Sequence, residues 1–170
     1  MKNHNQGSPN SGMQHDSMGH YTSFAVNMVL SLIVMYFVMF SMIDGWSDFR
    51  NNLNMLYMAL TMVAPMGVIM LLTMRGMYQS KPLNWALHAT LALIFIASLA
   101  ATRQQSAIGD RQFIASMIPH HSGAILMCRE ARIQDVELTK LCEEIKSAQR
   151  KEIEQMNAIR ARLESEAQNL

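Results

Sequence analysis

Three uncharged apolar segments constrain the fold of this chain more than any other feature. Residues 21–43, 51–74 and 82–102 contain no Asp, Glu, Lys or Arg. A helix needs about 20 mostly apolar residues to cross a bilayer, and each segment reaches that length. In lipid, the backbone polar groups of a crossing segment must bond within the protein, which favours a helix. The sequence therefore predicts three transmembrane helices over residues 21–103, joined by short loops, with the lipid bilayer as their partner.

The chain ahead of these segments has a different character. Residues 1–20 are rich in Gly, Ser, Asn and Gln and have no apolar period, so we expect a disordered tail. Its His and Met residues belong either to a solvated linker or to a segment that captures metal transiently; they are His4, Met13, His15, Met18 and His20. Lys and Arg are equally numerous near the two sides of the membrane region, so the positive-inside rule does not assign the orientation.

The region after the membrane segments is charged, and two amphipathic helices are expected there. The first runs from about Asp110 to Ala131, and the second begins after Asp135, a favourable N-cap residue. The connection between them is short enough to force an antiparallel hairpin. The predicted fold class is all-α, with three transmembrane helices followed by an antiparallel helical hairpin that forms a soluble domain over residues 108–166.

Folding this hairpin about its loop places polar residues inside an apolar seam. The apolar face expected for the first helix consists of Phe113, Met117, Ala124 and Cys128. In the middle of the seam, the dipeptide His120–His121 faces Gln149 and Glu152 of the second helix. Burying these groups costs several kcal/mol unless they pair with each other or bind something. They therefore form either a metal site or a satisfied polar network that sets the helix register.

The residue types on this seam determine which metal would bind. Neutral imidazole and thioether suit Cu(I) above all, with Ag(I) as a mimic, whereas His with carboxylate suits Zn(II) or Cu(II). Adjacent histidines point about 100° apart on a helix, so one of His120 and His121 can face the seam while the other faces solvent. The alternative is that Pro119 loosens the helix just before them and brings both to the same side.

A longer motif around these histidines resembles a known family. Residues 110–127 contain the core MIPHH and, with Gln149, Glu152 and Met156, resemble the bacterial family known as domain of unknown function 305 over about residues 108–165. Members of this family are ferritin-like four-helix bundles, and some bind copper or silver through His and Met in metal tolerance. The ligands that the resemblance implies are Met117, His120, His121, Met127 and Met156, with Asp110, Gln149 and Glu152 as supporting groups. One hairpin supplies half of such a bundle, so a homodimer is expected to complete it.

Other residues of the chain leave alternatives open. Cys128 and Cys142 form a disulfide if the domain lies in an oxidising periplasm, or free thiols near the metal if it lies in the cytosol. A third alternative is that they are two buried small apolar residues. His88, in the third membrane segment, is either a functional group or bonded to a neighbouring helix. Methionines recur every four residues in the second segment, at Met58, Met62, Met66, Met70 and Met74. Such a stripe is typical of flexible apolar packing, and the alternative is a thioether ladder that conducts Cu(I).

Together these features predict a bacterial inner-membrane protein whose periplasmic hairpin binds Cu(I) or Ag(I) for metal tolerance or handling. Copper is the expected cofactor, silver its mimic, and no organic cofactor is expected. The chain has no Ser/His/Asp set, phosphate loop or HExxH motif, so an enzyme is not expected. A net charge of +1 argues against a nucleic-acid partner. The alternative function is a membrane assembly or partner-binding module whose polar seam only sets the helix register.

Overall fold

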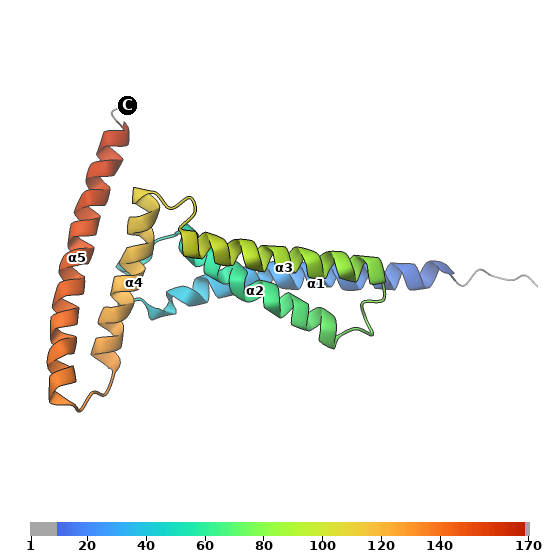
Figure 1. The fold of residues 1–170 in the computed structure, drawn as a ribbon, viewed down its shortest axis with the longest axis horizontal. Coiled ribbons are helices and arrows are strands. Elements are labelled where there is room, and N and C mark those ends of the chain that lie inside the picture. Colours follow the sequence, from blue (N-terminus) through green and yellow to red (C-terminus); the bar gives the residue numbers. More distant parts are fainter. Residues whose placement is uncertain (1–9, 169–170) are drawn as a thin grey trace, which may run out of the picture. The chain divides into compact units, whose positions relative to one another are not determined.

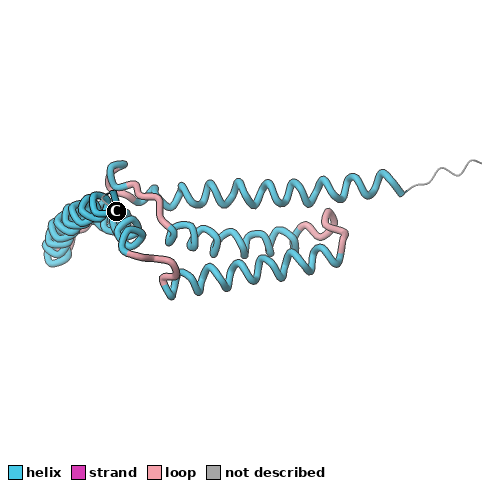
Figure 2. The backbone as a smooth tube through the Cα atoms, turned by 90° about the horizontal axis from the view of Figure 1, so that it is seen from above, coloured by secondary structure: helices cyan, strands magenta, loops and turns pink. Residues whose placement is uncertain are grey.

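The computed structural model describes residues 10–168, and the regular elements in that range are all helices (Figures 1 and 2). The α-helices are α1 (Asn10–Val38), α2 (Leu53–Thr73), α3 (Lys81–Gln104), α4 (Asp110–Glu130) and α5 (Val136–Gln168). Two short 3₁₀ helices, η1 (Met39–Met42) and η2 (Trp46–Asp48), lie between α1 and α2. The prediction of an all-α chain is confirmed for this range.

Three of the helical segments are long and apolar enough to cross a membrane. They are Gly19–Met42, Leu53–Thr73 and Lys81–Gln104, and they coincide closely with the segments predicted from the sequence. This agreement rests on length and composition, which are the same properties that made the segments stand out in the sequence.

The predicted disordered tail differs from the structure in its second half, because α1 already begins at Asn10. A formed helix gains one backbone hydrogen bond for each residue that it adds, so an apolar helix can extend into its polar flank. The first half of the predicted tail, with His4, lies outside the described residues. The side chains of Met13, His15 and Met18 lie outside them as well.

The helices belong to two compact units. The first unit comprises residues 1–35 and 59–100, and the second comprises residues 36–58 and 101–170. The first unit thus holds most of the three candidate membrane helices. The second holds α4, α5, the start of α2 and the connection between α1 and α2.

Within the first unit, the helices approach one another closely at Gly67 in α2. A Cβ atom at this position would lie 2.6 Å from Met28 Sδ on α1 and 3.0 Å from Leu91 Cδ1 on α3. Small residues allow such an approach between membrane helices, which associate through packing rather than through water exclusion. The buried core of this unit consists of Phe24, Ala64, Leu71, Tyr78 and Leu91.

Gly67→Val is expected to destabilise the first unit by about 1–3 kcal/mol, because the new methyl groups need space that Met28 and Leu91 occupy. Thermal unfolding of the purified protein in detergent would show this as a lower melting temperature. Gly76→Val is the matched control, since nothing lies within 4 Å of a Cβ atom at that position. Equal melting temperatures for the two variants would contradict the close packing at Gly67.

In the second unit, α4 and α5 pack side by side (Figure 1). Three contacts join them in opposite order along the chain: Cys128 with Cys142, His121 with Glu152, and Arg111 with Leu163. The apolar core between the helices consists of Ile114, Ile118 and Ile125 from α4 and Ile153 from α5.

The buried face of α4 differs from the face expected from the sequence. Ile114 and Ile118 are buried, whereas Phe113 is 51% exposed and Met117 is half-buried. The expected face placed Phe113 and Met117 in the seam with α5. The observed face is rotated by about one residue, because α4 has a second neighbour besides α5.

That second neighbour is the connection between α1 and α2. Ser122 is fully buried; its Oγ accepts a hydrogen bond from Asp44 N at 2.7 Å and donates one to Asp48 Oδ2 at 2.6 Å. A Cβ atom at Gly123 would lie 3.2 Å from the carbonyl oxygen of Met42, so the helix and this segment are in close contact. One side of α4 therefore packs on α5 and another packs on residues 42–48.

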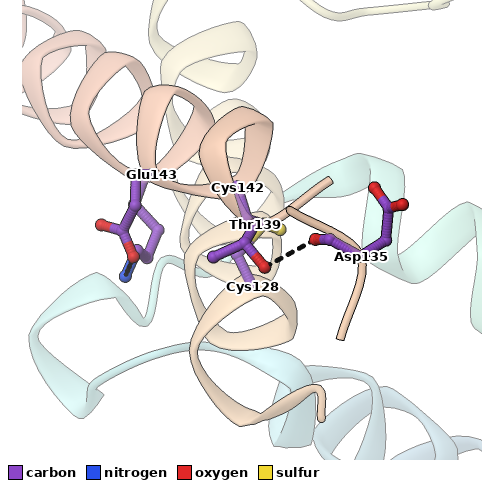
Figure 3. The surroundings of a disulfide bond; sticks show 6 residues. Cys128, Asp135, Thr139, Cys142 and Glu143 are labelled. Atoms are coloured by element: carbon purple, nitrogen blue, oxygen red, sulfur yellow. Dashed lines mark hydrogen bonds and ion pairs between the residues drawn. A yellow bond between two sulfur atoms is a disulfide. The ribbon is translucent and has the colours of Figure 1, made fainter. Parts of the chain in front are cut away.

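The start of α5 is held by a cap and by a disulfide (Figure 3). Asp135 Oδ1 accepts a hydrogen bond from Leu138 N at 2.8 Å, and the carbonyl oxygen of Asp135 accepts one from Thr139 Oγ1 at 2.8 Å. Asp135 is therefore the N-cap residue, as predicted. Cys128 and Cys142 form a disulfide with 5.3 Å between their Cα atoms. Of the states that the sequence left open, this structure contains the disulfide, in which neither sulfur is a thiolate ligand.

Candidate metal centre

His121 on α4 faces Glu152 on α5. His121 Nε2 lies 2.8 Å from Glu152 Oε2, and Nδ1 lies 2.8 Å from the carbonyl oxygen of Met117, one turn earlier. A carbonyl oxygen can only accept, so Nδ1 carries the hydrogen and the bond orients the ring. Metal-binding histidines are commonly oriented through their other nitrogen in this way. The sequence predicted that Gln149 and Glu152 both face the two histidines; the structure pairs His121 with Glu152.

Two arrangements would satisfy this pair of side chains. Nε2 can carry a second hydrogen and form an ion pair with Glu152, or a cation can lie between Nε2 and Oε2. Zinc bonds to N and O are about 2.0–2.2 Å long, so two ligand atoms 2.8 Å apart can share one ion. Among the described residues, however, no group of three or more His, Cys, Asp or Glu side chains could hold a metal ion. His121 and Glu152 therefore lack a third ligand of these types.

A second cluster of donor groups lies beside α4, in a pocket of about 270 Å³. Its sulfur and imidazole groups come from Met55 and Met58 of α2 and from Met117 and His120 of α4. The other lining residues are Asn52, Asn54, Thr102, Gln105, Phe113 and Ser116. Thioether and imidazole are soft or borderline neutral donors, which prefer Cu(I) and Ag(I) to hard ions. An ion can reach these groups because Met58 is 44% exposed and His120 is exposed.

The two histidines of the motif therefore have different surroundings. His120 lines the pocket, whereas His121 is absent from its lining and contacts Glu152. This agrees with the angular separation of adjacent residues on a helix. α4 continues as a helix through the buried Pro119, so the alternative in which Pro119 brings both histidines to one side is not supported.

Asn52 attaches the first turn of α2 to α4. Its side chain is buried, with the residue only 3% exposed. Asn52 Oδ1 accepts a hydrogen bond from Met55 N at 2.9 Å, and Nδ2 donates to the carbonyl oxygen of Ala115 at 3.3 Å. Leu53 N also donates to Gln112 Oε1 at 3.0 Å. The first bond caps α2, and the other two connect α2 to α4. Asn52 and Leu53 therefore hold Met55 close to Met117.

Arg50 adds a further contact at this junction. Its Nη1 donates to the carbonyl oxygens of Ser47 at 2.6 Å and Phe49 at 2.7 Å, and Nη2 donates to Asn157 Oδ1 on α5 at 3.4 Å. Burial lowers the pKa of Arg50 from its ordinary value, and the nearby charge of Arg160 lowers it further. Arg50 thus connects the segment before α2 to α5 through neutral oxygen acceptors.

The remaining candidates from the sequence lie elsewhere. Asp110 is exposed at the start of α4, and Met127 is 59% exposed near its end. Met156 packs against the apolar core between α4 and α5, and Gln149 is half-buried on α5. None of these four residues lines the pocket that holds Met117 and His120.

Sequence reasoning missed Met55 and Met58 as candidate ligands. They are the first two methionines of α2, whose methionine series is typical of apolar packing. The sequence signal that could have identified them is their position at the start of α2, directly after a loop, where an apolar side chain can contact a soluble domain. Their proximity to His120 depends on contacts between distant parts of the sequence.

Comparison with known proteins gives two matches. Residues 94–160, which contain all of α4 and most of α5, match the family described as Domain of unknown function (DUF305). The chain is also 31% identical over 141 residues to the uncharacterized protein L153 of Acanthamoeba polyphaga mimivirus, a match that covers 78% of this chain and 91% of that protein. No solved structure gives a significant match. The match to the family and the similarity to this relative together show that the chain belongs to the family with domain of unknown function 305.

Proposed function

We propose that this chain is a membrane-anchored metal-binding protein for Cu(I) or Ag(I), acting in metal tolerance or handling. The observation that supports this most strongly is the pocket beside α4, which three thioethers and one imidazole line without any carboxylate. A neutral, sulfur-rich donor set suits a soft monovalent cation. The proposed ligands are Met55, Met58, Met117 and His120.

In this proposal, His121 and Glu152 support the site without binding the ion in the pocket. His121 Nδ1 bonds to the carbonyl oxygen of Met117, the residue that supplies one of the thioethers. Glu152 holds the opposite side of the ring from α5. Residues of this kind orient a ligand through its neighbours and are expected to affect affinity less than the ligands do.

We further propose that the protein lies in a bacterial inner membrane with α4 and α5 in the periplasm. The disulfide between Cys128 and Cys142 supports this location, because cytosolic thiols are kept reduced. The three candidate membrane helices would supply the anchor.

The proposed assembly is a homodimer in which two antiparallel α4–α5 hairpins form a ferritin-like four-helix bundle. The disulfide, the His121–Glu152 contact and the Arg111–Leu163 bond join α4 and α5 in opposite chain order, which supports the hairpin. Apolar side chains remain exposed at its disulfide-linked end, where Met127, Leu138 and Leu141 are 59%, 46% and 48% exposed. A second copy would cover such a surface.

Titration of the full chain in detergent with Ag(I), without a thiol reductant, tests the metal proposal. Ag(I) is preferred as the probe because a thiol used to maintain Cu(I) would also open the disulfide and release two competing thiolates. We expect a dissociation constant of about 1 μM or lower. Met117→Leu and His120→Ala should each weaken binding roughly tenfold, which corresponds to about 1.4 kcal/mol per lost ligand. Met55→Leu and Met58→Leu should have similar effects.

Met127→Leu is the matched control. It removes a thioether from the same helix and keeps the side-chain volume, but Met127 does not line the pocket. Its affinity for Ag(I) should equal that of the wild type. Absence of binding by the wild type, or an equal loss in Met127→Leu and Met117→Leu, would exclude this site.

A second candidate function, a membrane assembly or partner-binding module, is favoured by the surroundings of His121. Both of its ring nitrogens already have partners within the protein. In such a module the polar seam only sets the register of α4 on α5. Dimerisation that is indifferent to Ag(I) and to the His120→Ala/His121→Ala double substitution, in a protein that binds no Ag(I), would support this function over the first.

A further inference from the structure

A pocket of about 450 Å³ lies where α2 ends and α3 begins, within the first unit. Its apolar lining residues are Leu71, Leu72 and Trp85, and its polar lining residues are Arg75, Lys81, Asn84 and His88. α2 and α3 are both long and apolar enough to cross a membrane, so their ends lie where a crossing helix would meet lipid headgroups. Trp85 is 78% exposed, and tryptophan is enriched at that level.

Arg75 and Lys81 bring two positive charges to this pocket without a counter-ion. Both residues are exposed, and neither forms an ion pair with any residue whose side chain the structure describes. The sequence offers no nearby partner, since residues 49–109 contain no Asp or Glu. Two like charges that line one pocket repel each other, so an anion between them is stabilised. Basic pockets between membrane helices bind anionic lipid headgroups for this reason.

His88 adds a hydrogen-bonding atom that the described protein does not use. Its Nδ1 lies 2.7 Å from the carbonyl oxygen of Asn84, so Nδ1 carries the hydrogen of that bond. Nε2 is buried and has no hydrogen-bond partner. A buried polar atom without a partner is destabilising. Because His88 follows Lys81 by seven residues on α3, it lies on the membrane side of the two cations.

Asn84 itself is already engaged by the protein. Its Oδ1 accepts a hydrogen bond from the Tyr21 hydroxyl at 2.8 Å, and its Nδ2 donates to the carbonyl oxygen of Tyr78 at 2.7 Å. Asn84 therefore shapes the pocket. The charged groups that remain for a ligand are Arg75 and Lys81.

We propose that this pocket binds one anionic phospholipid, such as phosphatidylglycerol. The phosphate binds Arg75 and Lys81, and an acyl chain packs on Leu71 and Leu72. The site shares no residue with the proposed metal pocket, so the two proposals stand or fall separately.

Native mass spectrometry of the full chain, released from micelles with equal amounts of phosphatidylglycerol and phosphatidylcholine, tests the charge requirement. We expect one phosphatidylglycerol to be retained per chain, with roughly tenfold preference over phosphatidylcholine. Arg75→Gln/Lys81→Gln should abolish the preference. Arg103→Gln/Arg132→Gln removes two charges outside the pocket and should preserve it. An equal loss in both double variants would indicate general surface attraction and overturn the proposal.

Phosphatidylmethanol tests whether the phosphate is the group that is bound, because it has the same charge as phosphatidylglycerol but no headgroup hydroxyl. The wild type should bind the two lipids equally, since Arg75 and Lys81 bind the phosphate that both share. A roughly tenfold preference for phosphatidylglycerol would show that the rest of the headgroup is recognised, and would overturn this assignment. Inorganic phosphate distinguishes the source of the anion: if it raises the melting temperature as much as phosphatidylglycerol does, the ligand is free phosphate and the lipid proposal is wrong.

Discussion

Opening the Cys128–Cys142 disulfide is expected to lower the free energy of unfolding of the α4–α5 pair by about 3 kcal/mol. The two cysteines are separated by 14 residues in sequence, and a loop of about 15 residues loses roughly that much conformational entropy in the unfolded state when it is closed. Cys142 is also 7% exposed, so its sulfur lies within the packed helix pair. Hydrogen exchange of the amides at the end of α4 and the start of α5, with and without reductant, measures the loss.

Cys128→Ala/Cys142→Ala provides the control for this experiment. Its amides should exchange as fast as those of the reduced wild type, and reductant should change them no further. Amides of α2 and α3 should be unaffected in either protein, because they belong largely to the other unit. Protection of α5 that is unchanged on reduction would show that packing alone holds the two helices, and would contradict the expected contribution of the disulfide.

Asn52→Ala is expected to lower the free energy of unfolding by about 2–3 kcal/mol and to weaken Ag(I) binding roughly tenfold. The substitution removes the cap of α2 at Met55 N, which contributes about 1 kcal/mol. It also leaves the carbonyl oxygens of Arg50 and Ala115 without the amide that donates to them at 2.9 Å and 3.3 Å. Affinity should fall because Met55 and Met58 are then no longer held beside Met117. Urea unfolding and Ag(I) titration measure the two effects.

Two further variants separate these contributions. Asn52→Ser keeps an uncharged oxygen that can cap α2 but loses both donated bonds, so its stability should lie between those of the wild type and Asn52→Ala. Asn54→Ala removes an exposed amide pair with Gln105 in the same pocket, and its stability and affinity should stay close to the wild type. Wild-type affinity in Asn52→Ala would show that the first turn of α2 supplies no ligand.

The helices themselves could be predicted from the sequence because their signals are local. The absence of charge over about 20 residues marked the three candidate membrane helices. Asp135, followed by a charged amphipathic stretch, marked the start of α5 to the residue. The short connection after α4 set which positions of the two helices meet, so the pairing of Cys128 with Cys142 was among the states that the sequence allowed. Each of these features depends on residues that are neighbours in sequence.

The tertiary structure decided which side chains of α4 share a site. Helical periodicity groups residues into faces, but it does not tell which other segment covers each face. Ser122 binds the segment at Asp44 and Asp48, and this second contact turns His120 and Met117 toward the start of α2 instead of toward α5. The sequence by itself therefore determined the three apolar helices, the charged helices after them and the similarity to the family over residues 94–160. The grouping of His120 with Met55 and Met58 was decided only by the tertiary structure, because it depends on two faces of α4 packing against different segments.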